Sequence, residues 1–243
     1  MWAFAGRRNH NTLGVAQRAT IESMDQTSPS LAHLTLADFT ERLASADPVP
    51  GGGSAAALAG TMAASLVAMV ARLSIDRPKY EQFRQGNERA LNEADAARAR
   101  LLKLTDDDTA AYGRYSAARQ LPRETEAEQR ARDEASRVAA RDASEVPLEV
   151  VRECVRLLDA IESIVGRSNV NAASDLEVAA RLCAAAARGA AANVAVNLPQ
   201  VGDERYAGAT MAEVGGLIHT IERSVAQVVQ QVASGGLRHP EAT

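Results

Sequence analysis

The chain has 243 residues, a formal net charge of -4 and a pI near 5.7. This length supports one substantial core, so we expect one domain with tails rather than two full domains. The acidic balance argues against nucleic-acid binding, which requires a basic surface. Hydrophobic residues make up 46% of the chain but aromatic residues only 3%, so small aliphatic side chains must form the core, which favours closely packed helices over sheets.

Helical periodicity begins near Leu34. We expect residues 1–33 to be a disordered or weakly ordered extension, residues 34–235 a helical domain and residues 236–243 a tail. The pattern predicts a short helix capped by Thr35, an apolar central helix capped by Ser54 and buried on all sides, and helices over 79–115, 123–143, 144–165 (with Pro147 in its first turn), 174–196 and 211–232. Strand-like alternation is absent from the sequence, so the predicted fold class is all-α, without a sheet.

The predicted central helix, residues 54–71, is apolar enough for a short membrane span, but polar residues interrupt it and Arg72 follows. We expect a buried core helix and no membrane association. Cys154 and Cys183 fall within helical patterns, which favours buried thiols in a reducing compartment. Since the first 20 residues lack the apolar stretch of a secretory signal, we expect a cytoplasmic protein.

A glycine-rich loop, Pro50, Gly51, Gly52 and Gly53, precedes Ser54. Glycines let the backbone approach a ligand closely, and the unpaired amides of a helix N-terminus bind anions or carbonyl oxygens. The alternative is a plain flexible turn, because the run matches neither of the glycine patterns that bind nucleotides.

Three adjacent acids, Asp106, Asp107 and Asp108, interrupt an apolar helical pattern. One of them can face a cleft, and Tyr112 lies one turn after Asp108 on the same face. The alternative is a solvated acidic patch.

Polar residues also gather at both ends of the predicted Ala-rich helix. They either bind a polar ligand or cap the helix, and the set comprises Asn169, Asn171, Ser174, Asp175, Asn193 and Asn197. The four histidines are scattered, without the spacing of a zinc site, so we expect no metal.

Several segments, in this order, resemble the cyclodeaminase/cyclohydrolase family, and the match spans roughly residues 36–232. They are DPVPGGGS (47–54), KY (79–80), DTAAY (108–112), VPL (146–148), NVNAASD (169–175) and GAAANVAVNL (189–198). The departures from the family pattern affect the expected substrate fit more than the fold. Ser168 and Val170 replace the Gly and Pro of the usual turn, and Ala191 and Ala192 replace bulkier residues before Asn193.

The resemblance implies an antiparallel helical bundle that forms homodimers and acts on tetrahydrofolate derivatives without another cofactor. It makes Asp108 the proton donor, and a separate formiminotransferase a possible partner. We extend it to a hypothetical folate-binding set, listed here: Pro50, Gly51, Gly52, Gly53, Ser54, Lys79, Tyr112, Asn171, Ser174, Asp175, Asn193 and Asn197.

The reaction expected from the resemblance is cyclodeamination of 5-formiminotetrahydrofolate to 5,10-methenyltetrahydrofolate and ammonia. The alternative is hydrolysis of 5,10-methenyltetrahydrofolate to the 10-formyl compound, because water can attack the same carbon. A second alternative, from another class, is a folate-binding helical dimer without catalytic activity.

Overall fold

The computed structural model describes residues 30–239, and all regular structure in this range is helical. The α-helices are α2 (Leu36–Leu43), α3 (Gly52–Ile75), α4 (Arg84–Arg119), α5 (Glu126–Ile164), α6 (Ala173–Asn197) and α7 (Glu204–Ser234). Short 3-10 helices are η1 (Leu31–His33), η2 (Pro78–Phe83), η3 (Val170–Ala172) and η4 (Leu198–Val201). The predicted all-α fold is confirmed.

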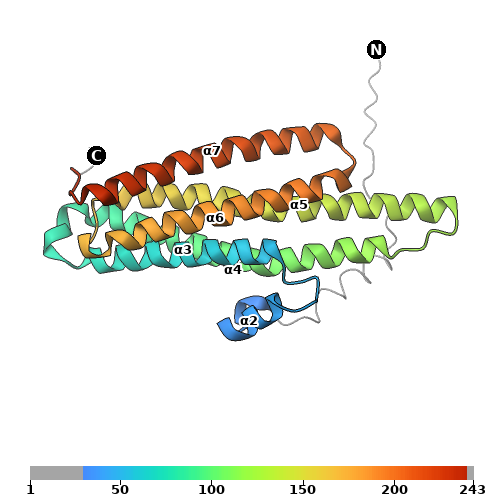
Figure 1. Cartoon of the computed structure of the whole chain (residues 1–243), viewed down its shortest axis with the longest axis horizontal. Helices are drawn as coiled ribbons and strands as arrows, with labels where there is room; N and C mark the ends of the chain where they lie inside the picture. The colour runs from blue at the N-terminus through green and yellow to red at the C-terminus, as the bar shows by residue number, and fades with distance from the viewer. Residues whose placement is uncertain (1–29, 240–243) are drawn as a thin grey trace, which may run out of the picture.

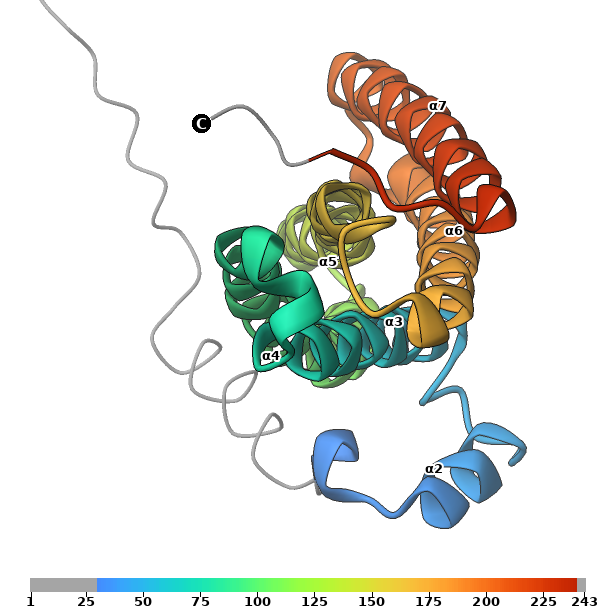
Figure 2. The ribbon, with the colours of Figure 1, turned by 90° about the vertical axis from the view of Figure 1, so that its left-hand side faces the viewer.

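The five long helices run side by side along one axis, and α2 stands apart from them on the side of α3 and α4 (Figures 1 and 2). Small side chains let the axes approach closely. Ala63 and Ala64 of α3 are fully buried, and a side chain at Gly60 would lie within 3.1 Å of Leu101 on α4. The core therefore has the Ala-rich packing that the composition predicts.

Several predicted helix boundaries were wrong. The segments 123–143 and 144–165 form one helix, α5, with Pro147 in its interior. Proline has no N–H to donate to the carbonyl of Ala143, four residues earlier. The side-chain amide of Asn197 on α6 donates to that carbonyl instead, at 2.6 Å. A long-range hydrogen bond thus satisfies the group that Pro147 leaves free, which a local sequence pattern does not reveal.

The helix starts also differ from the predictions. Thr35 caps α2 as expected, accepting from the N–H of Asp38. However, α3 begins at Gly52, so Ser54 lies in its first turn and is not the cap. At α6 the N-cap is Ala172, and neither Ser174 nor Asp175 has a capping hydrogen bond. Helix α4 begins at residue 84 after η2, and α7 begins at residue 204.

The central helix is not buried on all sides in the single chain. By length and apolarity α3 meets the criteria for a membrane span, yet 61% of its most apolar window is buried in the bundle, as in a core helix. Its outward face exposes Met62 (45%), Met69 (38%) and Leu73 (39%). Cys154 and Cys183 are free and buried, as predicted.

Candidate active site

A pocket of about 180 Å³ lies where the first turn of α3 meets α4, α5 and the end of α6. The walls come from elements far apart in the sequence. The lining residues are Pro48, Val49, Gly51, Gly52, Gly53, Asp108, Tyr112, Tyr115, Ala143, Asn193 and Asn197. The structure thus brings Asp108, most of the glycine loop, Tyr112 and both predicted asparagines of α6 together.

Asp108 lies directly against the first turn of α3. The hydroxyl of Ser54, which is fully buried, donates to its Oδ2 at 2.9 Å. A Cβ at Gly53 would lie 2.0 Å from Oδ1, so only glycine permits this approach. The glycine-rich segment therefore packs specifically against the Asp108 carboxyl group and is not a plain flexible turn.

The carboxyl group of Asp108 is only partly exposed. Burial raises its pKa above the ordinary value, because removal from water disfavours the charged form. Hydrogen bonds from the Ser54 hydroxyl and backbone N–H oppose this and lower the pKa, but burial has the larger effect. Such a group keeps its proton to a higher pH than an ordinary aspartate and is suited to acid catalysis.

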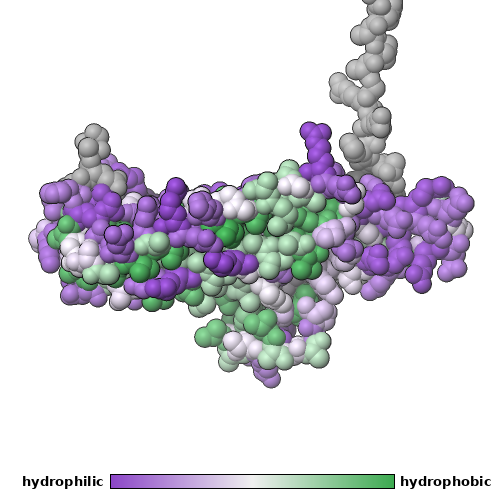
Figure 3. Space-filling view, turned by 45° about the horizontal axis from the view of Figure 1, so that its top comes forward, coloured by the Kyte–Doolittle hydropathy of each residue, from purple (hydrophilic) through white to green (hydrophobic). Residues whose placement is uncertain are grey.

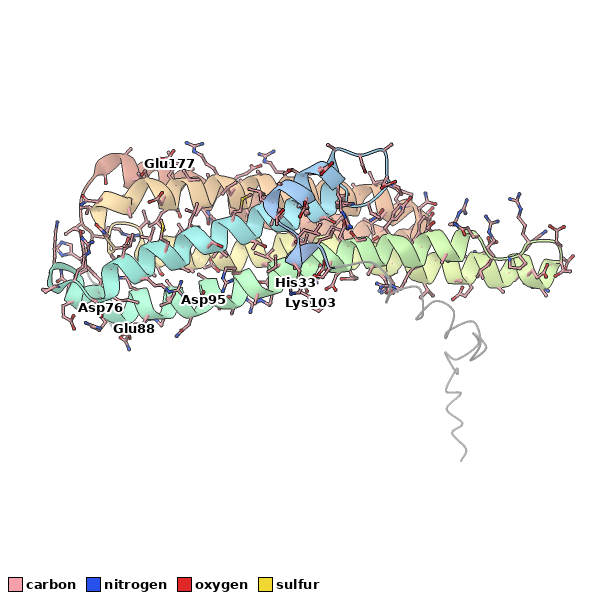
Figure 4. All side chains as sticks on the ribbon, turned by 90° about the horizontal axis from the view of Figure 1, so that it is seen from below. His33, Asp76, Glu88, Asp95, Lys103 and Glu177 are labelled. Atoms are coloured by element: carbon pink, nitrogen blue, oxygen red, sulfur yellow. The ribbon has the colours of Figure 1, made fainter. Side chains whose placement is uncertain are left out.

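The three adjacent acids have three different environments. Asp106 accepts from the N–H of Leu31 and the hydroxyl of Ser30, both at 2.6 Å, which holds η1 against α4. Asp107 pairs with Lys103 at the surface, at 2.6 Å. Figure 4 shows η1, marked by His33, over α4 near Lys103. The three acids therefore do not form one solvated patch. Asp107 is at the surface, Asp106 binds η1, and of the three only Asp108 lines the pocket.

The asparagines of α6 contribute amides to the opposite wall. The Asn193 side chain donates to the carbonyl of Gly189 in its own helix, at 2.9 Å. Its amide also lies 3.5 Å from where a Cβ at Gly52 would be. Asn197 donates to Ala143 on α5. Both side chains thus donate to backbone carbonyl groups, and both line the pocket.

Six predicted substrate-binding residues do not line this pocket. Pro50 is buried in the loop, and Ser54 lies behind Asp108. Lys79 follows the C-terminus of α3, and the other three residues, Asn171, Ser174 and Asp175, flank the N-terminus of α6.

That group of four lies at the far end of α3 from Asp108. The N–H of Asn169 donates to Ser74 near the end of α3, which fixes the segment there. The 24 residues of α3 span about 36 Å, so within one chain these residues are remote from the pocket.

The sequence interpretation did not assign four lining residues to the site, namely Pro48, Val49, Tyr115 and Ala143, although the first two belong to the 47–54 family segment. Tyr115 lies three residues after Tyr112, so helical spacing could have placed it beside that residue. Ala143 carries no sequence signal, because its role depends on Pro147 and on a contact with α6. Residues 30–239 hold no group of three or more His, Cys, Asp or Glu side chains that could bind a metal.

Comparison with known proteins identifies the family. The model of the formiminotransferase-cyclodeaminase family matches residues 35–215, most of the chain. The chain belongs to this family. A methenyltetrahydrofolate cyclohydrolase from Methylorubrum extorquens is 35% identical over 184 residues, which cover 76% of this chain and 88% of that protein.

Two cyclodeaminases extend the family match. Pig (Sus scrofa) formimidoyltransferase-cyclodeaminase is 30% identical over 203 residues, which cover 84% of this chain but only 38% of the pig protein. The crystal structure of formiminotetrahydrofolate cyclodeaminase from Thermotoga maritima matches with a TM-score of 0.75 and 28% identity. This match covers 83% of the present chain and 97% of that structure, so the resemblance predicted from the sequence is confirmed.

The contact between Gly53 and Asp108 gives a prediction about stability. We expect Gly53→Ala to lower the free energy of unfolding by about 1–3 kcal/mol, because its methyl group must displace the carboxyl group. Gly86→Ala is the matched control, since Gly86 is a helical glycine with open space around it. This substitution should leave the free energy of unfolding unchanged or raise it by up to about 1 kcal/mol. Urea unfolding measures both, and equal values for the two variants would contradict the proposed packing.

Proposed function

We propose that this protein is a formiminotetrahydrofolate cyclodeaminase in which Asp108 is the general acid. The observation that carries the proposal is the Asp108 carboxyl group, held at the pocket by Gly53 and Ser54, with a pKa that burial raises. Family membership and the cyclodeaminase named among its structural relatives support the substrate class.

The proposed reaction joins N10 of the folate to the formimino carbon. A carbon–nitrogen bond forms at N10, the N10 proton passes to the imino nitrogen, and a tetrahedral centre bearing an amino group results. The bond to the amino nitrogen then breaks, and ammonia leaves after that nitrogen takes a proton from Asp108. Such proton transfer contributes about 10²- to 10⁴-fold to a rate. The reaction requires no metal or second cofactor.

The second candidate is methenyltetrahydrofolate cyclohydrolase. It is favoured by the 35% identity to the Methylorubrum protein of that name. Water would add to the same carbon, the bond to N5 would break, and N5 would take the proton. In this direction the ionised Asp108 would accept a proton from water, so one pocket serves either reaction.

Substitution of Asp108 tests the proposed function. With 5-formiminotetrahydrofolate, we expect Asp108→Asn to lower kcat by about 10²- to 10⁴-fold, because the amide cannot supply the proton. Asp107→Asn is the matched control and should retain activity, since its carboxylate pairs with Lys103 at the surface. The absorbance of the methenyl product follows the reaction.

Three outcomes would contradict parts of this proposal. Full activity in Asp108→Asn would assign proton transfer to another group. Turnover of only the methenyl compound by the wild-type protein would favour the cyclohydrolase. Stoichiometric binding without turnover of either folate would favour a non-catalytic dimer.

We also propose that the active unit is a homodimer formed through α3. Its outward apolar face consists of Leu58, Met62, Leu66, Met69 and Leu73, which share one side of the helix. Next to it α2 exposes Leu36 and Leu43. The pocket of one chain, about 180 Å³, is also small against the roughly 300–1,000 Å³ of typical ligand sites. A second copy would cover the apolar face and enlarge the site.

A two-fold axis across the middle of α3 would make the two copies of this helix antiparallel. The start of α3, beside Asp108, would then lie next to the end of α3 in the partner. Lys79, Asn171, Ser174 and Asp175 are at that end. The proposed dimer thus gives these predicted binding residues a place at the partner's pocket.

Mixing two inactive variants tests this shared site. We expect Asp108→Asn and Asp175→Asn each to be nearly inactive. After unfolding and refolding together, they should recover about a quarter of wild-type activity, because half of the dimers are mixed and each holds one intact site. No recovery above the separate variants, or full activity of Asp175→Asn, would contradict a site built from two chains. A Met62→Arg variant that stays dimeric in light scattering would contradict the proposed interface.

A further inference from the structure

A second, smaller hollow of about 150 Å³ adjoins the candidate active site. It lies between α4, α5 and η4 and is lined by Tyr115, Arg119, Asp133, Ser136, Arg137 and Gln200. Tyr115 lines both hollows, and its hydroxyl donates to Gln200 at 3.2 Å. The two hollows therefore share the Tyr115 side chain as a common wall.

The charge of the hollow favours an anion. Its lining includes two arginines, Arg119 and Arg137, and one acid, Asp133. Arg137 has a loose surface contact with Glu134, at 3.6 Å. Within the described range the Arg119 side chain makes no ion pair, while its carbonyl accepts from Arg132. Arginine presents a planar set of donors that matches a carboxylate.

Ser136 gives an independent indication of a ligand. The residue is 7% exposed, and its hydroxyl has no hydrogen-bond partner in the part of the chain that the structure describes. A buried polar group without a partner is destabilising, so such groups are rare outside binding sites. Here the unpartnered hydroxyl lies in the wall of a hollow that also holds two arginines.

The position along α4 matches the shape of a folate. Arg119 follows Asp108 by eleven residues, which is about 16 Å along the helix. In a folate, a flat p-aminobenzoyl ring separates the reacting carbon from the carboxylates of the glutamate tail. With the one-carbon unit at Asp108, the ring would pass Tyr112 and Tyr115, and the tail would extend toward Arg119.

We propose that Arg119, Arg137 and Ser136 bind the glutamate tail of the substrate, with the two arginines at its carboxylates and the hydroxyl donating to a tail oxygen. This inference rests on the proposed function, because it assumes a folate at Asp108. It assigns a role to the end of the α4–α5 hairpin that extends beyond the other helices, a strongly hydrophilic surface in Figure 3. The sequence pattern had predicted a helix over 123–143 and no binding residue in it.

Equilibrium binding of three probes tests the inference: tetrahydropteroate, which lacks glutamate, tetrahydrofolate and its triglutamate. In the wild-type protein each glutamate-bearing probe should bind at least about tenfold more tightly than tetrahydropteroate. Arg119→Ala and Arg137→Ala should each remove about tenfold of this gain and leave tetrahydropteroate binding unchanged. Ser136→Ala should weaken tail binding less, by about threefold, since it removes one neutral donor.

Arg130→Ala is the matched control, because it removes the same charge from α5 at a surface residue that pairs only weakly with Glu126. It should change the affinity of no probe. Equal affinities for tetrahydropteroate and both folates, or equal effects of the Arg130, Arg119 and Arg137 substitutions, would overturn the tail site while leaving a folate at Asp108 intact. Failure of all three probes to bind the wild-type protein would instead overturn the proposed function, and the tail site with it.

Discussion

The contact between the first turn of α3 and the carboxyl group of Asp108 is the constraint on which the candidate site depends. Gly53 has no side chain, so the carboxyl group can approach the helix backbone, and Ser54 donates to it from a fully buried position. Around this contact the small side chains of the bundle let α3 and α4 pack closely, which leaves the carboxyl group only partly exposed. Burial and close packing together hold an acid whose pKa is raised.

The surrounding hydrogen bonds fix the other walls of the pocket. Pro147 leaves the carbonyl of Ala143 without its helical partner, and Asn197 supplies the missing donor. This bond joins α5 to the end of α6 beside the pocket. Asp106 makes another long-range contact outside the pocket lining, where it holds η1 against α4. Both interactions join residues more than 50 positions apart in the sequence.

Much of the fold was predictable, because the Ala-rich composition and the 3.6-residue periodicity both depend on local sequence. Asp108 and the glycine loop were predicted through family resemblance, while spacing alone left a solvated patch and a flexible turn as alternatives. The continuous helix through Pro147 was not predictable, since it depends on Asn197. Periodicity also does not show which end of the bundle a residue occupies. Lys79 was therefore grouped with Asp108, although within one chain the two residues lie at opposite ends of α3.

The most direct test of this account is the pKa of the Asp108 carboxyl group, measured by carbon NMR in the whole protein and assigned with Asp108→Asn. We expect a pKa above the ordinary value of 3.8, because burial outweighs the hydrogen bonds from Ser54. We also expect a further rise in Ser54→Ala, which removes a hydroxyl that stabilises the ionised form. A pKa at or below 3.8, or a fall in Ser54→Ala, would contradict a buried general acid held by this serine.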